Sequence, residues 1–126
     1  FCKNSDMNKQ QDIFTRTTAS AFLDALLEKG ISHVFANAGT DFAPVIEALV
    51  MAKKQNRPVP RFHIVPHENV AVAMAHGYYM ATGTPAAVMV HVTVGTANAM
   101  CALMNASRDN IPVLLMAGRT PHTEYG

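Results

Sequence analysis

Short apolar segments alternate along this chain with longer stretches of helical periodicity, and this alternation limits the fold more than any other feature. The apolar segments lack the strict polar and apolar alternation of half-exposed strands, which is typical of strands buried on both faces. Helical stretches between them favour right-handed crossovers between parallel strands. The sequence therefore predicts an α/β fold with an open, mainly parallel sheet covered by helices on both faces.

The predicted elements follow one another from residue 18 to residue 117. Strands are expected at 33–36, 61–65, 86–91 and 112–117. Helices are expected at 18–29, 67–82 and 95–106, and a further helix is expected to begin after an N-cap at Asp41. Residues 1–16 form a polar leader whose composition favours disorder. Residues 17–126 are expected to form one domain.

Composition excludes several classes of protein. The chain has 126 residues, of which 49% are hydrophobic, enough for the core of a single domain. Its net charge is +1 with scattered basic residues, so no nucleic-acid surface is indicated. No apolar run approaches the roughly 20 residues of a membrane span, and no signal-peptide core begins the chain. Cys2 and Cys101 lie in a polar tail and an apolar helix, which favours reduced thiols and a cytoplasmic setting.

Polar residues follow the predicted strands, beyond the carboxyl ends where open α/β sheets bind ligands. They fall in residues 37–41, 66–69, 93–98 and 118–122. Glu68 stands out because it opens a helix that is apolar on nearly every face, and an unpartnered buried carboxylate is costly. Taken alone, this position suits an acid that complements the helix dipole. The alternative is a carboxylate held there for chemistry.

Three familiar site motifs do not fit the sequence. His67 and Glu68 begin like a zinc-protease helix, but the second histidine of that motif would fall at Ala71. None of the six histidines has the ligand spacing of a metal site, so we expect no metal held by this chain alone. The glycines form neither a G-x-G-x-x-G dinucleotide fingerprint nor a Gly-Lys-Ser/Thr phosphate loop.

A string of short motifs occurs in a distinctive order. The motifs are Gly30-Ile31-Ser32-His33-Val34-Phe35, Asn37-Ala38-Gly39-Thr40, His67-Glu68-Asn69, Ala75-His76-Gly77-Tyr78, Ala81-Thr82-Gly83, Gly95-Thr96-Ala97-Asn98-Ala99 and Asn110-Ile111-Pro112-Val113-Leu114. From about residue 17 to residue 126 the chain thus resembles the N-terminal pyrimidine-binding domain of thiamine-diphosphate-dependent enzymes. This group contains acetolactate synthases, pyruvate oxidases and benzoylformate decarboxylases. The combination of motifs, rather than any one of them, makes the resemblance specific.

The resemblance implies thiamine diphosphate as the cofactor and gives Glu68 a role. In the family, a glutamate here hydrogen-bonds the aminopyrimidine ring nitrogen and favours the tautomer that deprotonates the thiazolium carbon, while the protein positions the cofactor. The resemblance places further residues at the cofactor: Ala38, Gly39, Gly95, Thr96 and Asn98. The last three are also typical of ordinary turns and caps, which remains an alternative.

The segment from His91 to Met100 resembles the benzoylformate decarboxylase pattern, in which a histidine precedes Gly-Thr-Gly-Asn-Ala-Met. The resemblance implies that His91 exchanges protons with the substrate, a task that suits imidazole near neutral pH. It also implies that the Thr40 hydroxyl contacts the substrate carboxylate. The alternative for His91 is a residue that closes a strand and bonds a loop carbonyl. Ala38 replaces a proline of the decarboxylases, so the resemblance does not determine the identity of the substrate.

The resemblance further implies that one side of the cofactor site lies outside this chain. The family's Gly-Asp-Gly motif, which holds Mg²⁺ and the diphosphate, is absent from the sequence. We therefore expect a fold that is incomplete at the C-terminus, a diphosphate-binding domain or subunit as partner, a homo-oligomer (dimer or tetramer), and no activity of the chain alone. The predicted function is part of a benzoylformate-decarboxylase-like enzyme acting on a 2-oxo acid. An acetolactate-synthase-like carboligase and a non-catalytic α/β module remain alternatives.

Overall fold

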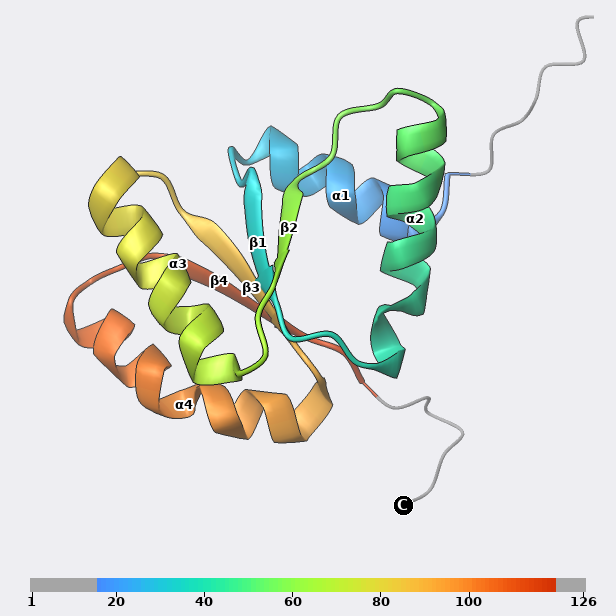
Figure 1. The fold of residues 1–126 in the computed structure, drawn as a ribbon. Helices are drawn as coiled ribbons and strands as arrows, with labels where there is room; N and C mark the ends of the chain where they lie inside the picture. Colours follow the sequence, from blue (N-terminus) through green and yellow to red (C-terminus); the bar gives the residue numbers. More distant parts are fainter. Residues whose placement is uncertain (1–15, 120–126) are drawn as a thin grey trace, which may run out of the picture.

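The computed structural model describes residues 16–119, so the predicted leader lies outside it except for Arg16. The described residues form a parallel sheet in the order β2-β1-β3-β4 (Figure 1). The strands are β1 His33–Ala36, β2 Arg61–Ile64, β3 Ala86–Val90 and β4 Val113–Ala117. The helices are α1 Thr18–Glu28, α2 Ala43–Lys54, α3 Glu68–Thr82 and α4 Val92–Arg108, with a 3₁₀ helix η1 Thr40–Phe42 before α2. The expected parallel α/β fold is confirmed.

Each face of the sheet is covered by one pair of helices. α1 and α2 lie on one side, over a core that includes Val34 and Ala87, and α3 and α4 lie on the other, over Phe35 and Val88 (Figure 1). Successive strand residues therefore serve opposite cores, and β3 is buried along its whole length. This explains why the strands read as continuous apolar runs.

Local capping fixes where the helices begin and end. The Thr17 hydroxyl accepts a hydrogen bond from the Ser20 N–H at 3.1 Å and caps α1. Gly83 ends α3 in the left-handed conformation (φ 69°), and its N–H donates to the Tyr79 carbonyl at 2.7 Å. None of the helices within residues 16–119 combines the length and apolarity needed to cross a membrane.

Two predicted helix starts are wrong. Phe42, rather than Asp41, precedes α2, and the Asp41 side chain bonds His91 instead of capping the helix. α4 begins at Val92, ahead of the expected start at Gly95, because the Gly95 N–H already donates to the His91 carbonyl at 2.7 Å. The remaining boundaries differ from the predictions by about one or two residues, which is the usual scatter of element ends.

β1 and β3 are neighbours in the sheet, yet the chain leaves them toward opposite faces. After β1 it passes through η1 into α2 on one face, and after β3 it enters α4 on the other. In open α/β proteins such a switch point is where ligands bind. The amino ends of α2, α3 and α4 lie along this edge, at the lower side of the sheet in Figure 1. The fold therefore directs the search for a site to the loops after β1, β2 and β3.

Candidate functional site

Glu68, the first residue of α3, is buried with only 8% of its surface exposed. It does not cap the helix, because the His67 ring already accepts a hydrogen bond from the Asn69 N–H at 3.2 Å. Its Oε2 instead accepts a hydrogen bond from Asn98 Nδ2 of α4, at 3.3 Å. Within the described part of the chain, Oε1 makes no hydrogen bond. The carboxylate is thus held from one side and keeps one oxygen for another partner.

Gly95 keeps the space beside this carboxylate open. A Cβ at this position would lie 3.3 Å from Glu68 Oε1 and 3.1 Å from the Cβ of Val90, closer than the usual 3.5–4.0 Å or so between non-bonded atoms. The Gly95 N–H also donates to the carbonyl of His91. Close approach therefore explains why glycine stands here, and Gly95 is the point where the surroundings of Glu68 and of His91 meet.

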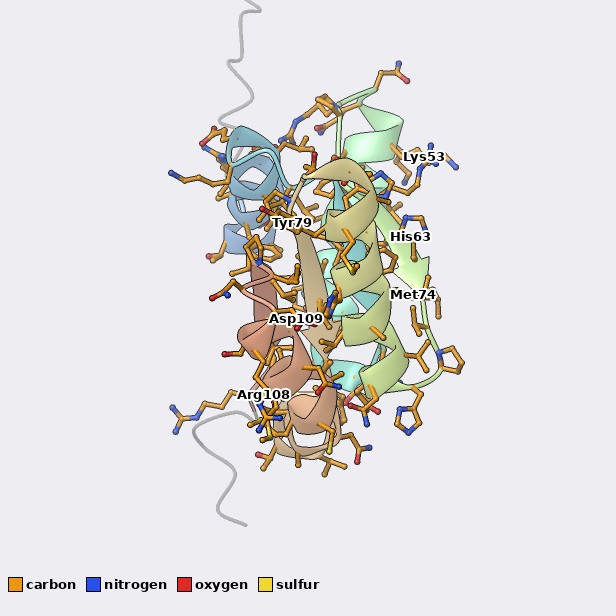
Figure 2. All side chains as sticks on the ribbon, turned by 90° about the vertical axis from the view of Figure 1, so that its left-hand side faces the viewer. Lys53, His63, Met74, Tyr79, Arg108 and Asp109 are labelled. Atoms are coloured by element: carbon orange, nitrogen blue, oxygen red, sulfur yellow. The ribbon has the colours of Figure 1, made fainter. Side chains whose placement is uncertain are left out.

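Asn69 holds the same corner together from the next position. Its Oδ1 accepts a hydrogen bond from the Ala102 N–H at 3.1 Å, in the middle of α4. Together with the bond between Asn98 and Glu68, this ties the start of α3 to α4, and the two helices lie side by side in Figure 2. Asn69 had no predicted role, because an asparagine in a first helical turn is typical of ordinary capping.

His91 follows β3 and meets Asp41, which lies in η1 after β1, across the switch point. Its Nδ1 lies 2.6 Å from Asp41 Oδ1. The imidazole is 40% exposed, whereas the Asp41 side chain is only 9% exposed. A Cβ at Gly39 would overlap the ring, and one at Gly118 would overlap the carboxylate. The ring thus bonds a carboxylate and, among the described residues, no loop carbonyl.

The residue after His91 has an unusual backbone. Val92 has φ 34°, a region that β-branched residues rarely adopt, at a cost of about 1–3 kcal/mol. The Thr96 hydroxyl donates to the Val92 carbonyl at 2.8 Å, so its proton is used within α4. Strained backbone of this kind clusters at functional sites, where the surrounding structure holds it.

The structure brings together most of the predicted site residues. The group comprises Glu68, Gly95 and Asn98 with His91 and Gly39, together with Asp41; we call it the edge site. Ala38 is exposed in the loop after β1, and Thr40 is exposed at the start of η1. The Thr40 hydroxyl makes no hydrogen bond within residues 16–119. Asp41 was missed as a site residue because only the order of the strands places it beside His91.

Other polar clusters lie elsewhere in the fold. His33 begins β1, at the opposite edge of the sheet, and its Nδ1 lies 2.9 Å from Nε2 of His63. Burial, together with His63 and Arg61, lowers the pKa of His33 below its usual value of 6.5.

A depression beside α1 is lined by Arg16, Asp24, Gln55 and Arg57, and the Arg57 guanidinium is already bonded to the Asp24 carboxylate at 2.7 Å. Residues 16–119 contain no group of three or more His, Cys, Asp and Glu that could hold a metal ion.

The sequence and the fold are both similar to known proteins. Residues 16–126 match the family model of the thiamine pyrophosphate enzyme, N-terminal TPP binding domain. The chain is 31% identical over 111 residues to the mitochondrial acetolactate synthase catalytic subunit of Aspergillus candidus, covering 88% of the chain and 15% of the relative. It is 32% identical over 111 residues to benzoylformate decarboxylase of Pseudomonas aeruginosa, covering 88% of the chain and 20% of the relative.

Two solved structures share the fold with a TM-score of 0.69. One is a putative thiamin diphosphate-dependent enzyme from Mycobacterium smegmatis, 31% identical, with 84% of this chain and 19% of that chain covered. The other is a thiamine diphosphate-dependent 4-hydroxybenzoylformate decarboxylase from Rhodococcus jostii, 29% identical, with 85% and 19% covered. The chain therefore spans about a fifth or less of the length of the relatives it matches.

Proposed function

The chain belongs to the thiamine pyrophosphate enzymes, as an N-terminal TPP-binding domain. On this premise, we propose that it supplies one side of a thiamine diphosphate site in an enzyme that decarboxylates a 2-oxo acid. The observation that carries the proposal is the carboxylate of Glu68. It is buried at the carboxyl edge of a parallel sheet, supported by Asn98, and has one oxygen without a hydrogen bond in the described residues. A carboxylate so placed is ready to bind a nitrogen heterocycle.

The residues around Glu68 fit the pyrimidine end of the cofactor. Oε1 of Glu68 would hold the ring nitrogen, Gly95 would leave room for a flat ring beside it, and Asn98 would fix the carboxylate from behind. Thr96 would serve through its backbone and its hydroxyl oxygen, since its hydroxyl proton is bonded to Val92. Thiamine diphosphate, when bound, supplies a nucleophilic carbon and an electron sink for the substrate.

The substrate side of the proposed site is formed by the loops after β1 and β3. The partly exposed ring of His91 would exchange a proton with the 2-oxo acid. The hydroxyl of Thr40, exposed at the start of η1, would bind the substrate carboxylate, with the backbone of Ala38 and Gly39 lining the approach to the cofactor. Proton transfer by a positioned side chain contributes about 10²–10⁴-fold to a rate.

The diphosphate and Mg²⁺ would be held by a second, diphosphate-binding domain, in the same polypeptide or in a partner subunit. We refer to this domain together with the present one as the complete assembly, and we expect it to be a cytoplasmic homo-oligomer, a dimer or tetramer. The greater length of the relatives supports this division of the site. The exposed thiol of Cys101, unpaired among the described residues, is compatible with a reducing compartment.

An acetolactate-synthase-like carboligase is the second candidate, because the chain is about as similar to an acetolactate synthase subunit as to a benzoylformate decarboxylase. The two functions differ in the electrophile that follows decarboxylation. Supplying the complete assembly with benzoylformate or with pyruvate, and measuring CO₂, aldehyde and acyloin products, separates them. A decarboxylase converts one 2-oxo acid into one aldehyde and one CO₂, whereas a carboligase converts two molecules of pyruvate into one coupled product and one CO₂.

Replacement of Glu68 by glutamine tests the proposal directly. Glu68→Gln keeps the size of the side chain but cannot share a proton with a ring nitrogen as a carboxyl group does. We expect cofactor-dependent CO₂ release by the complete assembly to fall by at least about 100-fold. The matched control is Glu47→Gln, on the exposed side of α2, for which we expect activity within about twofold of the unmodified protein.

The outcomes separate an enzyme from a non-catalytic module. Full activity of Glu68→Gln would refute a cofactor role for this carboxylate, and an assembly without any thiamine-dependent turnover would favour a module that keeps only the fold. We also expect the 126-residue chain alone to show no decarboxylation. Turnover by that chain would contradict the division of the site between two domains.

A further inference from the structure

The contact between His91 and Asp41 determines which nitrogen of the imidazole carries the proton. An ionised carboxylate can only accept hydrogen bonds, so in a bond of 2.6 Å to Asp41 Oδ1 the Nδ1 atom of His91 must be the donor. A neutral imidazole carries one N–H proton, and its other nitrogen is then an acceptor. With Nδ1 protonated, Nε2 is the ring nitrogen that can take up a proton.

The surroundings of the carboxylate fit this orienting role. The Asp41 side chain is only 9% exposed, whereas the ring that it bonds is 40% exposed. Its second oxygen, Oδ2, is buried and has no hydrogen-bond partner within residues 16–119. An acid buried only for stability would be expected to have both oxygens bonded, because unsatisfied buried polar atoms are costly. Among the described residues, the carboxylate thus bonds His91 alone.

Two glycines leave room for this arrangement. Gly39, after β1, faces the imidazole, and Gly118, after β4, faces the carboxylate; a Cβ on either would overlap its partner. The backbone of Gly39 is extended (φ −130°, ψ −172°), a conformation open to any residue, so the requirement for glycine comes from space and not from its torsion angles. The segments after β1, β3 and β4 therefore define where the ring and the carboxylate lie.

We infer that Asp41 is a positioning residue for His91: it holds the imidazole in the tautomer protonated at Nδ1, so that Nε2 is the atom that exchanges a proton with the 2-oxo acid. The inference rests on the proposed role of His91. It adds a residue that touches neither cofactor nor substrate and acts through the histidine. Its effect belongs to the proton-transfer step, and it leaves substrate binding largely unchanged.

The test combines a spectroscopic and a kinetic measurement. Histidine labelled with ¹⁵N in the 126-residue chain reports by NMR which ring nitrogen of His91 carries the proton, with the signal assigned from His91→Gln. We expect Nδ1–H in the unmodified protein and its loss in Asp41→Ala. In the complete assembly, we expect Asp41→Asn to lower kcat by about 10- to 100-fold, as loss of an orienting partner typically does, and to change KM by less than about threefold.

Controls keep the two levels of the proposal apart. Asp109→Asn removes another acid that contacts a histidine and should change neither the His91 signal nor kcat. If Asp41→Ala does not fold, Asp41→Leu, which keeps the shape of the buried side chain and has no acceptor for the Nδ1–H, replaces it in the NMR measurement. An Nε2–H tautomer in the unmodified protein, or unchanged tautomer and kcat in the Asp41 variants, overturns the inference. Loss of the Nδ1–H signal in Asp41→Ala, combined with full activity of His91→Gln, would instead support the pairing and refute the proposed role of His91.

Discussion

Residues 16–119 contain two contacts between a histidine and an aspartate, and they are built in opposite ways. In the edge pair, His91 and Asp41, the atoms are 2.6 Å apart, the acid is 9% exposed and the imidazole 40%. In the helix pair, His76 of α3 and Asp109 at the end of α4, they are 3.4 Å apart, the imidazole is 17% exposed and the acid 61%. Asp109 is labelled in Figure 2, on the side where α3 and α4 lie together.

The proposed catalytic histidine and the helix-packing histidine thus differ in whether the ring or the acid is the buried partner. A buried acid with an exposed ring fixes the orientation of the ring and leaves it open to a reaction partner. A buried ring with an exposed acid packs two helices together, and the contact with the carboxylate adds little because the carboxylate is exposed to solvent. The same two residue types therefore predict different consequences of mutation, which the following experiments compare.

The largest contrast is expected between the two histidines. His91→Gln removes the proposed proton-transfer group and should lower kcat of the complete assembly by about 10²–10³-fold. His76→Gln should leave kcat within about twofold and lower the free energy of unfolding by roughly 1 kcal/mol through lost packing. Steady-state kinetics and urea unfolding of both variants measure the two effects. Similar losses of kcat in the two variants would contradict the proposed difference between the histidines.

A smaller loss is expected when the edge pair is displaced without being removed. Gly118→Ala places a Cβ where the Asp41 carboxylate lies, and a shift of the orienting acid should lower kcat by roughly 10-fold. Gly77→Ala is the matched control, because nothing lies within 4 Å of a Cβ there. In α3 this control should raise the free energy of unfolding by about 0.5–1 kcal/mol. Full activity of Gly118→Ala would show that the pair tolerates displacement.

A histidine paired with another histidine extends the comparison to pH. The pKa of His33 is lowered, chiefly by burial and then by His63 and Arg61, so the unfolded chain binds this proton more readily than the folded one. His33 therefore contributes to stability fully above pH 6.5, and this contribution falls as the pH drops below 6.5 toward its folded pKa. Urea unfolding of the unmodified chain and of His33→Gln across this range should show a weaker pH dependence in the variant. Parallel curves would contradict the assignment.

The smallest effect is expected at the exposed acid of the helix pair. Asp109→Asn removes a charge whose partner is 3.4 Å away, and the charge also lies unfavourably at the carboxyl end of α4. The two effects oppose each other, so the free energy of unfolding should change by less than about 0.5 kcal/mol. Thermal unfolding at low and high salt measures it. A loss above about 2 kcal/mol would show that exposure does not distinguish the pairs.

The fold was largely predictable from the sequence because its signals are local and agree with one another. The apolar run of β3, the threonine cap at Thr17 and the left-handed Gly83 each act within a few residues. Alternating strands and helices then leave few topologies besides a parallel sheet. Glu68 was singled out because it opens an apolar helix after a strand, and Asn98 because of the family resemblance of its motif. Their contact could not be inferred from either motif.

The edge pair was not predictable in the same way. Asp41 stands just before a helix and was interpreted as its N-cap, since an acid at that position commonly has this role. The order β2-β1-β3-β4 decides otherwise, because it makes β3 the neighbour of β1 and brings their loops together. The sequence shows which residues follow each strand, whereas the pairing of strands decides which of these loops meet.

The edge site also has a consequence for the order of folding events. Asp41 and His91 are 50 residues apart in the chain, and Glu68 and Asn98 are 30 apart. Closing such loops is slow, and non-local parallel pairing is among the slower steps of folding. The site can form only after β1 and β3 have paired, so during refolding its assembly should follow helix formation. A partly folded intermediate can thus have most of its helical content while the edge site is still unassembled.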